Sequence, residues 1–212
     1  MTKKTADEKI TVSKLLAAIK DTSEFKQYSH DSRADVVNAL KAHSFKTVLD
    51  LDCGTGLLLK QMFEAFPDMT ACGFDYSLDR IAEAKKRLAD CNAEFKFGNA
   101  LQLPYEDNQF DLVVSTSTFN HYTQPLDILT EVARVLKPNG LLMICDTYLN
   151  ATLRYLHKIS KPINQVAGMR IYTEKEVWQM MNAAGFTGIK WEKINRFTYL
   201  AQGVVAKLPE LN

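Results

Sequence analysis

Acidic residues and glycines alternate within one short stretch of this 212-residue chain, at Asp50, Asp52, Gly54 and Gly56. Glycine lets the backbone adopt a positive φ and lets a ligand approach the main chain closely. A helix that follows such a turn offers unpaired N–H groups and a partial positive charge. The pattern therefore predicts a turn that binds a small ligand, although a plain strand-to-helix turn would also explain two glycines.

The spacing of the glycines discriminates between ligands. A dinucleotide-binding turn carries a third glycine three residues after the second, where this chain has Leu59, and the Gly-Lys-Ser/Thr of a phosphate-binding loop is also absent. A nucleoside ligand without a pyrophosphate needs neither feature. Its ribose would still use a carboxylate at the end of the second strand, and Asp75 occupies that place.

Short apolar runs alternate with helical patterns from Lys46 onward. We expect strands at residues 46–51, 70–75, 93–98, 110–116 and 141–147. Three helices are expected between these strands. The first ends before Pro67, and the second is capped by Ser77. The third begins near Pro125 and has four apolar residues on one face: Leu126, Leu129, Val132 and Leu136. Residues 137–140 (KPNG) are expected to form a turn. Such alternation predicts an α/β fold with a doubly wound parallel sheet that binds ligands at the strands' carboxyl ends.

Helical patterns also stand at both ends of the chain. Before the first strand we expect a helix at residues 10–20, a polar connector at 21–32 and a second helix at 33–42. Thr173 and Glu176 have the spacing of a capping box for a helix that ends at Gly185. Two more strands are expected at residues 187–194 and 199–207.

Four segments carry a family resemblance when they are taken in order: VLDLDCGTG, GFDYSLDRIAEAKKR, GNALQLPYEDNQFDLVVSTSTFNHY and EVARVLKPNGLLMICD. Together they resemble the class I S-adenosylmethionine-dependent methyltransferases, in the small-molecule branch with a methyltransferase type 11-like domain. The resemblance implies a three-layer αβα sandwich, Rossmann-like, with a mostly parallel seven-stranded sheet and an antiparallel last strand. We therefore expect a single domain overall, with an N-terminal helical cap at 1–45 and the cofactor-binding methyltransferase domain at 46–212.

The resemblance assigns cofactor-binding roles position by position. Asp50, Gly54 and Gly56, with Asp52 and Cys53 between them, match the motif that holds the methionine end of S-adenosylmethionine. Asp75 matches the ribose-binding acid, and Tyr76 matches a residue that often packs on adenine. The adenine-reading segment corresponds to Asn99, Ala100 and Leu101, and Ser115 lies beside the methionine moiety.

Two positions depart from the family pattern. Asp52 stands where the family usually has glycine or another small residue, and Asn99 stands where it usually has aspartate. Aspartate tolerates a positive φ at a cost of about 1 kcal/mol, so we expect Asp52 to point at the ammonium of the cofactor or to solvent. An asparagine can still accept a hydrogen bond from the adenine amino group, so Asn99 is expected to be harmless.

The implied reaction is in-line attack on a methyl group bonded to a sulfonium, with S-adenosylhomocysteine as product. The protein has to align the reactants at about 3 Å and exclude water. A general base helps when the acceptor carries a proton. His121 is the candidate, because an imidazole has a pKa of about 6.5; a surface or structural histidine is the alternative interpretation.

Substrate contacts are expected from the segments that cover the strand ends. The irregular stretch 148–172 interrupts the alternation where a substrate cap would lie, and its arginines have the chemistry to bind a carboxylate or phosphate. The alternative is that they are solvated charges on a connector. The candidate substrate residues are Tyr28, Asn120, Arg154, Arg170 and Tyr172.

The composition excludes several classes of substrate and site. With 26 basic and 25 acidic residues the chain is nearly neutral, and it has no Asn-Pro-Pro-Tyr type motif, so a small-molecule substrate is expected rather than nucleic acid. The four cysteines lack metal-binding spacing, so no metal site is expected. No signal peptide and no apolar run of about 20 residues are present, which predicts a cytoplasmic protein without a membrane partner.

Two other functions remain open from the sequence. One is a methyltransferase-like protein that binds the cofactor without turnover and acts through partners, which the departures at Asp52 and Asn99 allow. The other is a nicotinamide-dependent enzyme, against which Leu59 argues. Among methyltransferases, transfer to O, N or C is equally open.

Overall fold

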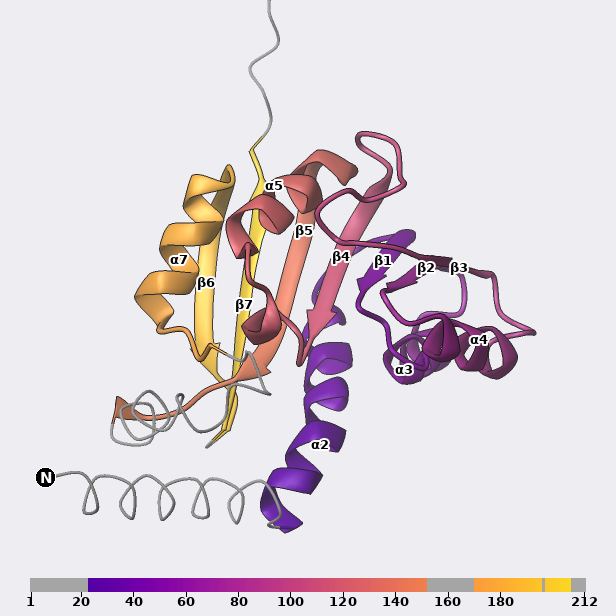
Figure 1. Cartoon of the computed structure of the whole chain (residues 1–212), viewed down its shortest axis with the longest axis horizontal. Coiled ribbons are helices and arrows are strands. Elements are labelled where there is room, and N and C mark those ends of the chain that lie inside the picture. Colours follow the sequence, from indigo (N-terminus) through magenta and orange to yellow (C-terminus); the bar gives the residue numbers. More distant parts are fainter. Residues whose placement is uncertain (1–22, 152–169, 196, 207–212) are drawn as a thin grey trace, which may run out of the picture.

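The computed structural model describes residues 23–151, 170–195 and 197–206. A seven-stranded sheet crosses it in the order β3-β2-β1-β4-β5-β7-β6, which Figure 1 shows from right to left. Neighbouring strands are parallel except for β7, which is antiparallel to β5 and to β6. The strands are β1 Thr47–Leu51, β2 Thr70–Asp75, β3 Ala93–Phe97, β4 Phe110–Thr116, β5 Leu136–Thr147, β6 Phe186–Lys193 and β7 Thr198–Val205.

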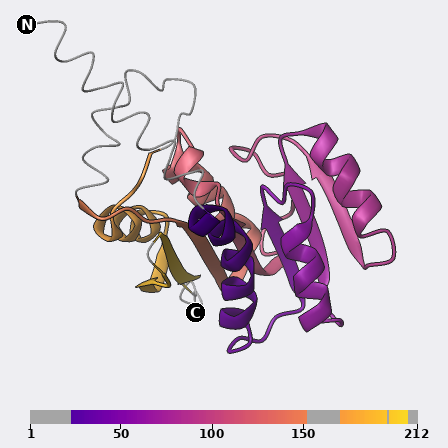
Figure 2. The same cartoon turned by 90° about the horizontal axis from the view of Figure 1, so that it is seen from below.

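Helices cover both faces of this sheet. They are α2 Ser23–Leu40, α3 Leu57–Ala65, α4 Leu78–Arg87, the 3₁₀ turn η1 Phe119–His121, α5 Pro125–Val135 and α7 Glu174–Ala183. Successive strand residues enter opposite cores: Val48 packs in the core with α2, α3 and α4, whereas Leu49 packs in the core with α5 and α7. In the second view, α2 lies along the sheet (Figure 2), which agrees with its contacts to β5 and β7. The three-layer α/β fold with its antiparallel last strand is confirmed.

Local signals fix the ends of the helices. Ser77 accepts a hydrogen bond from Arg80 N at the start of α4, as predicted. The predicted capping box is present at α7, where Thr173 and Glu176 exchange side-chain and backbone hydrogen bonds. Among the described residues, no helix is both long and apolar enough to span a bilayer.

Three expected details are wrong. Helix α2 runs from Ser23 to Leu40 rather than over 33–42; a helix propagates cheaply from a packed end, and no glycine or proline interrupts 23–33. Strand β5 begins at Leu136, so residues 137–140 lie within it, where a register shift against β4 absorbs the irregular segment. Leu136, expected on the apolar face of the helix that begins near Pro125, is extended and is the first residue of β5, because α5 ends at Val135. The helix expected at residues 10–20 lies outside the described residues.

Candidate functional site

The turn after β1 has the backbone that its sequence predicts. Asp52, Gly54 and Gly56 all have positive φ, at 59°, 55° and 77°. A Cβ at Gly56 would lie 3.0 Å from Leu88 Cδ1 and 3.3 Å from Ala84 Cβ, so this glycine lets the start of α3 approach α4. A Cβ at Gly54 would meet nothing within 4 Å, which leaves the main chain at that position open to a ligand.

Asp75, at the end of β2, anchors this turn. Its Oδ2 accepts a hydrogen bond of 2.9 Å from Gly54 N, and its Oδ1 accepts one of 2.8 Å from Ser77 N. The side chain is wholly buried, with Arg80 Nη1 3.9 Å from Oδ2. Asp75 therefore lies beside the glycine turn, as expected, but its oxygens are already used in shaping the turn.

Asp50 is a buried acid without a hydrogen-bonding partner. It is 1% exposed, and neither carboxylate oxygen has a partner within the described part of the chain. Burial raises its pKa well above the usual value, and the charges of Asp52 and Asp75 raise it further. A carboxylate left in this state is available to a cationic group, such as the ammonium of a bound amino acid.

Asp52 contacts a residue that the sequence did not single out. Tyr122 Oη donates a hydrogen bond to Asp52 Oδ2, across 70 positions of the chain. Burial raises the pKa of Asp52 to about 6, although the bond from Tyr122 acts in the opposite direction. Asp52 was expected to point at the ammonium of the cofactor or to solvent; in the structure its φ is positive and its carboxylate contacts the phenol of Tyr122.

A hollow of about 600 Å³ opens between this turn and the segment after β4. Its walls bring together six of the predicted site residues: Asp52, Tyr76, Asn99, Ala100, Leu101 and His121. The remaining lining residues are Gly98, Thr118, Tyr122, Thr123, Gln124 and Ile128. We refer to this hollow as the crevice.

The crevice residues from β2 and β3 differ in how they are held. Tyr76 is 62% exposed, and the guanidinium carbon of Arg80 lies 5.5 Å from the centre of its ring. Asn99 Oδ1 accepts a hydrogen bond of 3.0 Å from Leu101 N, which folds this segment into a turn. The ring of Tyr76 is thus an open apolar face, whereas the amide oxygen of Asn99 is already engaged.

Asn120 is buried within a polar network rather than exposed to the crevice. Its backbone N and its Nδ2 donate to the two oxygens of Asp146, at 3.0 and 2.8 Å, and Nδ2 also reaches Thr147 O at 3.1 Å. Burial raises the pKa of Asp146 to about 6. The pair fixes η1 to the end of β5, and η1 ends at His121, which is followed by Tyr122.

The other expected residues lie around the crevice or beyond it. Arg170 forms an ion pair with Glu176 at 2.9 Å, and Tyr172 packs against Phe119 with ring centres 5.6 Å apart; neither residue lines the crevice. Ser115 is buried beside Tyr122, and Cys53 is a buried thiol whose pKa burial raises. Arg154 and the side chain of Tyr28 lie outside the described residues.

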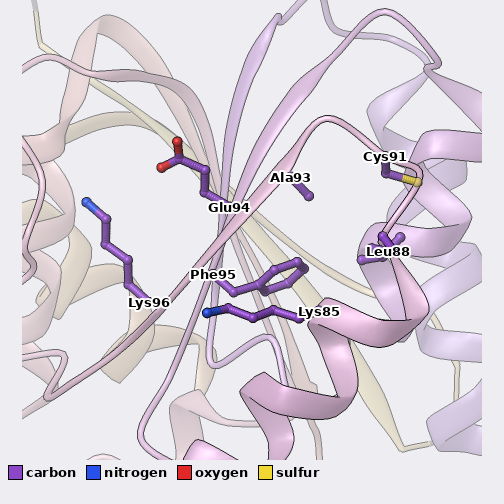
Figure 3. A pocket seen from close by; sticks show the side chains of 8 residues that line it. Lys85, Leu88, Cys91, Ala93, Glu94, Phe95 and Lys96 are labelled. Atoms are coloured by element: carbon purple, nitrogen blue, oxygen red, sulfur yellow. The ribbon is translucent and has the colours of Figure 1, made fainter.

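A second hollow, of about 450 Å³, lies between α4 and the edge strand β3. Figure 3 shows Phe95 and Leu88 on its inner side, with Glu94 and Lys96 projecting from the other side of β3. Its lining includes none of the predicted site residues. The candidate site is therefore the crevice at the carboxyl ends of β1, β2 and β4.

Comparison with known proteins decides the family. A family model described as a methyltransferase domain matches residues 42–198, about three quarters of the chain. The chain belongs to this methyltransferase family. It is a class I S-adenosylmethionine-dependent methyltransferase, so S-adenosylmethionine is its cofactor, and the open main chain at Gly54 and the unpaired acid Asp50 fit such a ligand.

Relatives and solved structures resemble this methyltransferase over different fractions of its length. It is 36% identical to the ubiquinone/menaquinone biosynthesis C-methyltransferase UbiE of Desulfotalea psychrophila, over 47% of this chain and 41% of that protein. It is 28% identical to the demethylmenaquinone methyltransferase of Paenarthrobacter aurescens, over 77% and 71%. The fold matches Haemonchus contortus phosphoethanolamine N-methyltransferase 2 in complex with S-adenosyl-L-methionine, with a TM-score of 0.69, 14% identity and coverage of 84% and 53%.

Proposed function

We propose that this methyltransferase transfers a methyl group to a small-molecule acceptor by in-line displacement. The observation that carries the proposal is the crevice of about 600 Å³, which has Asp52 of the glycine turn on one wall and residues of the segment 118–124 on the other. This volume is within the usual range for sites that enclose a small ligand. One wall is suited to an adenosyl ligand, and the other to its acceptor.

Each wall has a separate task in this proposal. The unpaired Asp50 and the open turn at Gly54 hold the amino-acid end of the cofactor. Tyr76 offers its exposed ring to adenine, and Asn99 with its two following residues borders the base. Asp75 acts on the ribose and, through its bond to Gly54 N, on the shape of the turn.

S-adenosylmethionine supplies an electrophilic methyl group, which leaves the protein to align the acceptor and exclude water. His121 is exposed at the crevice wall. Where the methyl acceptor has to lose a proton during the reaction, an imidazole nitrogen at this place takes that proton. Tyr122, Leu101 and Ile128 add apolar surface to the same hollow. These walls favour an acceptor with an apolar ring over a highly charged one.

The names of the relatives suggest which acceptors to test first. Two of them are named for methylation of ubiquinone or menaquinone precursors, and a third is named malonyl-[acyl-carrier protein] O-methyltransferase, from Priestia megaterium. A first panel therefore contains a reduced demethylnaphthoquinone, a malonyl thioester, a simple phenol and a primary amine. Formation of S-adenosylhomocysteine with each compound is followed by mass spectrometry.

Binding and turnover have to be measured separately. Calorimetry with S-adenosylmethionine, followed by the acceptor panel, separates an active enzyme from a cofactor-binding protein that acts through partners. His121→Gln should lower turnover about a hundredfold for a proton-losing acceptor and leave cofactor affinity unchanged. Methylation of RNA or protein in place of every small molecule would contradict the proposal.

A further inference from the structure

Asp52 has a strained backbone conformation at its position in the turn. Its φ is 59°, a conformation that glycine adopts freely and that strains an aspartate. The turn itself therefore gains nothing from a side chain there. The carboxylate lines the crevice and receives its hydrogen bond from the neutral phenol of Tyr122, which leaves the negative charge in place when Asp52 is ionised.

Acidic residues gather around Asp52 at this end of the crevice. Asp50 and Asp75 are close enough to Asp52 for their charges to influence one another. No lysine or arginine is among the described residues that line the crevice. Arg80 is a nearby cation whose charge acts to lower the pKa of Asp52, but its side chain is half exposed and lies 3.9 Å from Asp75 Oδ2.

Substrate and product differ in charge at a single atom. S-adenosylmethionine carries a permanent positive charge at sulfur, and S-adenosylhomocysteine has a neutral thioether there. The ammonium and carboxylate of the amino-acid end are common to both. A carboxylate near the sulfur therefore attracts the substrate form more than the product form, and partial burial strengthens that attraction.

We propose that Asp52 makes this crevice select its adenosyl ligand by charge, so that it binds the sulfonium more tightly than the thioether. The proposal rests on the proposed function, because it requires the crevice to hold the adenosyl ligand. Its consequence for the reaction is direct: transfer of the methyl group removes the charge that Asp52 recognises, and the product leaves more easily. The hydrogen bond from Tyr122 does not neutralise the carboxylate, so the selection depends on the charge of Asp52 and not on this bond.

Calorimetry with three ligands tests the proposal. The ligands are S-adenosylmethionine, S-adenosylhomocysteine and sinefungin, an analogue that carries an amino group in place of the sulfonium methyl. Measurements at about pH 8 keep the carboxylate of Asp52 ionised. The quantity compared is the ratio of the dissociation constants of the thioether and of each cationic ligand.

Four proteins separate charge from hydrogen bonding. Asp52→Asn keeps an acceptor for Tyr122 but removes the charge, and Asp52→Gly restores the residue usual in the family without backbone strain. Tyr122→Phe keeps the charge but removes the hydrogen bond. The wild type and Tyr122→Phe should prefer both cationic ligands by about tenfold or more, and the two Asp52 variants should lose most of that preference.

The outcomes distinguish the two proposals. A ratio that is equal in the wild type and in Asp52→Gly, with both proteins folded by circular dichroism, overturns charge selection. So does an equal loss of affinity for all three ligands, since that result assigns Asp52 to the shared ammonium. Absence of binding by any ligand to the wild type would instead overturn the proposed function of the crevice.

Discussion

The phenol of Tyr122 donates a hydrogen bond to the carboxylate of Asp52 and so joins the segment after β4 to the turn after β1. These are the two walls of the crevice. Because burial raises the pKa of Asp52 to about 6, ionisation of this one group is coupled to the stability of the fold and to the charge of the site.

The stability effect of Asp52 should depend on pH. An unfolded aspartate has a pKa of about 3.9, so the folded chain keeps this proton in a range where the unfolded chain has released it. The ionised carboxylate therefore destabilises the fold above about pH 6 and has no such effect below about pH 4. Asp52→Asn should be more stable than the wild type by ~1–2 kcal/mol at about pH 8, and this gain should disappear by about pH 4.

Urea titrations of both proteins at the two pH values measure this difference. Asp146 also has a pKa raised to about 6 by burial, but it is present in both proteins and its contribution cancels. A gain that is the same at both pH values would show that Asp52 is not the group responsible.

Asp75 should affect stability and cofactor binding together. Asp75→Ala removes the acceptor for two backbone N–H groups, those of Gly54 and Ser77. The expected loss is ~2–3 kcal/mol of unfolding free energy, because two partly buried donors lose a charged partner. Affinity for S-adenosylmethionine should fall at least about tenfold, a change of ~1.4 kcal/mol, since Gly54 loses its anchor.

Ser77→Ala is the matched control for this experiment. Ser77 caps α4 next to Asp75, and its hydroxyl accepts a bond of 3.4 Å from Arg80 N. Loss of the cap should cost ~1 kcal/mol or less and leave cofactor affinity unchanged. If the two variants weaken cofactor binding equally, the turn is not held by Asp75 in the way that its hydrogen bonds indicate.

Asp146 should affect turnover more than cofactor affinity. Asp146→Ala removes the acceptor of the buried backbone N–H of Asn120 and one of the two acceptors of its Nδ2, at an expected cost of ~2–3 kcal/mol. The loss of these bonds frees η1, and the last residue of η1, His121, lines the crevice. Thermal unfolding, calorimetry and turnover with an accepted substrate give the three quantities to compare.

Arg170→Ala provides the contrast. Its exposed ion pair with Glu176 contributes at most ~1 kcal/mol, and the residue does not line the crevice. Turnover should therefore stay near the wild-type level. A large loss of turnover would favour the sequence-based prediction that Arg170 contacts substrate.

Most of the fold could be predicted because its signals are local. The strands Thr70–Asp75 and Phe110–Thr116 are apolar runs with clear boundaries, and their expected limits match the structure. The caps at Ser77 and Thr173 depend on residues three positions away. The start of α2 was missed because residues 23–32 carry no apolar stripe, and the helix continues through them from a packed end.

The candidate site could likewise be predicted where its residues are close in the sequence, and could not where they are far apart. Asp50, Gly54 and Gly56 lie within seven residues, so their spacing alone predicted a ligand-binding turn. Tyr122 and Asp146 were missed because their partners lie 70 and 26 positions away. Such contacts depend on the order of the strands, which places the ends of β1, β4 and β5 side by side. In the sequence, Tyr122 looks like an ordinary polar position after a strand, and Asp146 looks like an ordinary polar position near the end of one.

The two glycines of the turn should respond differently to alanine. Gly56→Ala combines a positive φ of 77° with a contact of 3.0 Å to Leu88, so we expect a loss of ~2–3 kcal/mol of unfolding free energy. Gly54→Ala has only the backbone strain of φ 55°, because nothing lies within 4 Å of its new Cβ, and should cost ~1 kcal/mol. Denaturant titration measures both losses.

Cofactor affinity should show the opposite order. The space beside Gly54 is the space that the proposed function gives to the ligand, so a methyl group there should weaken binding of S-adenosylmethionine by about tenfold or more. Gly56→Ala perturbs the packing of α3 on α4 and should weaken binding less in a protein that remains folded. If Gly54→Ala binds the cofactor as the wild type does, the main chain at Gly54 is not where the ligand approaches.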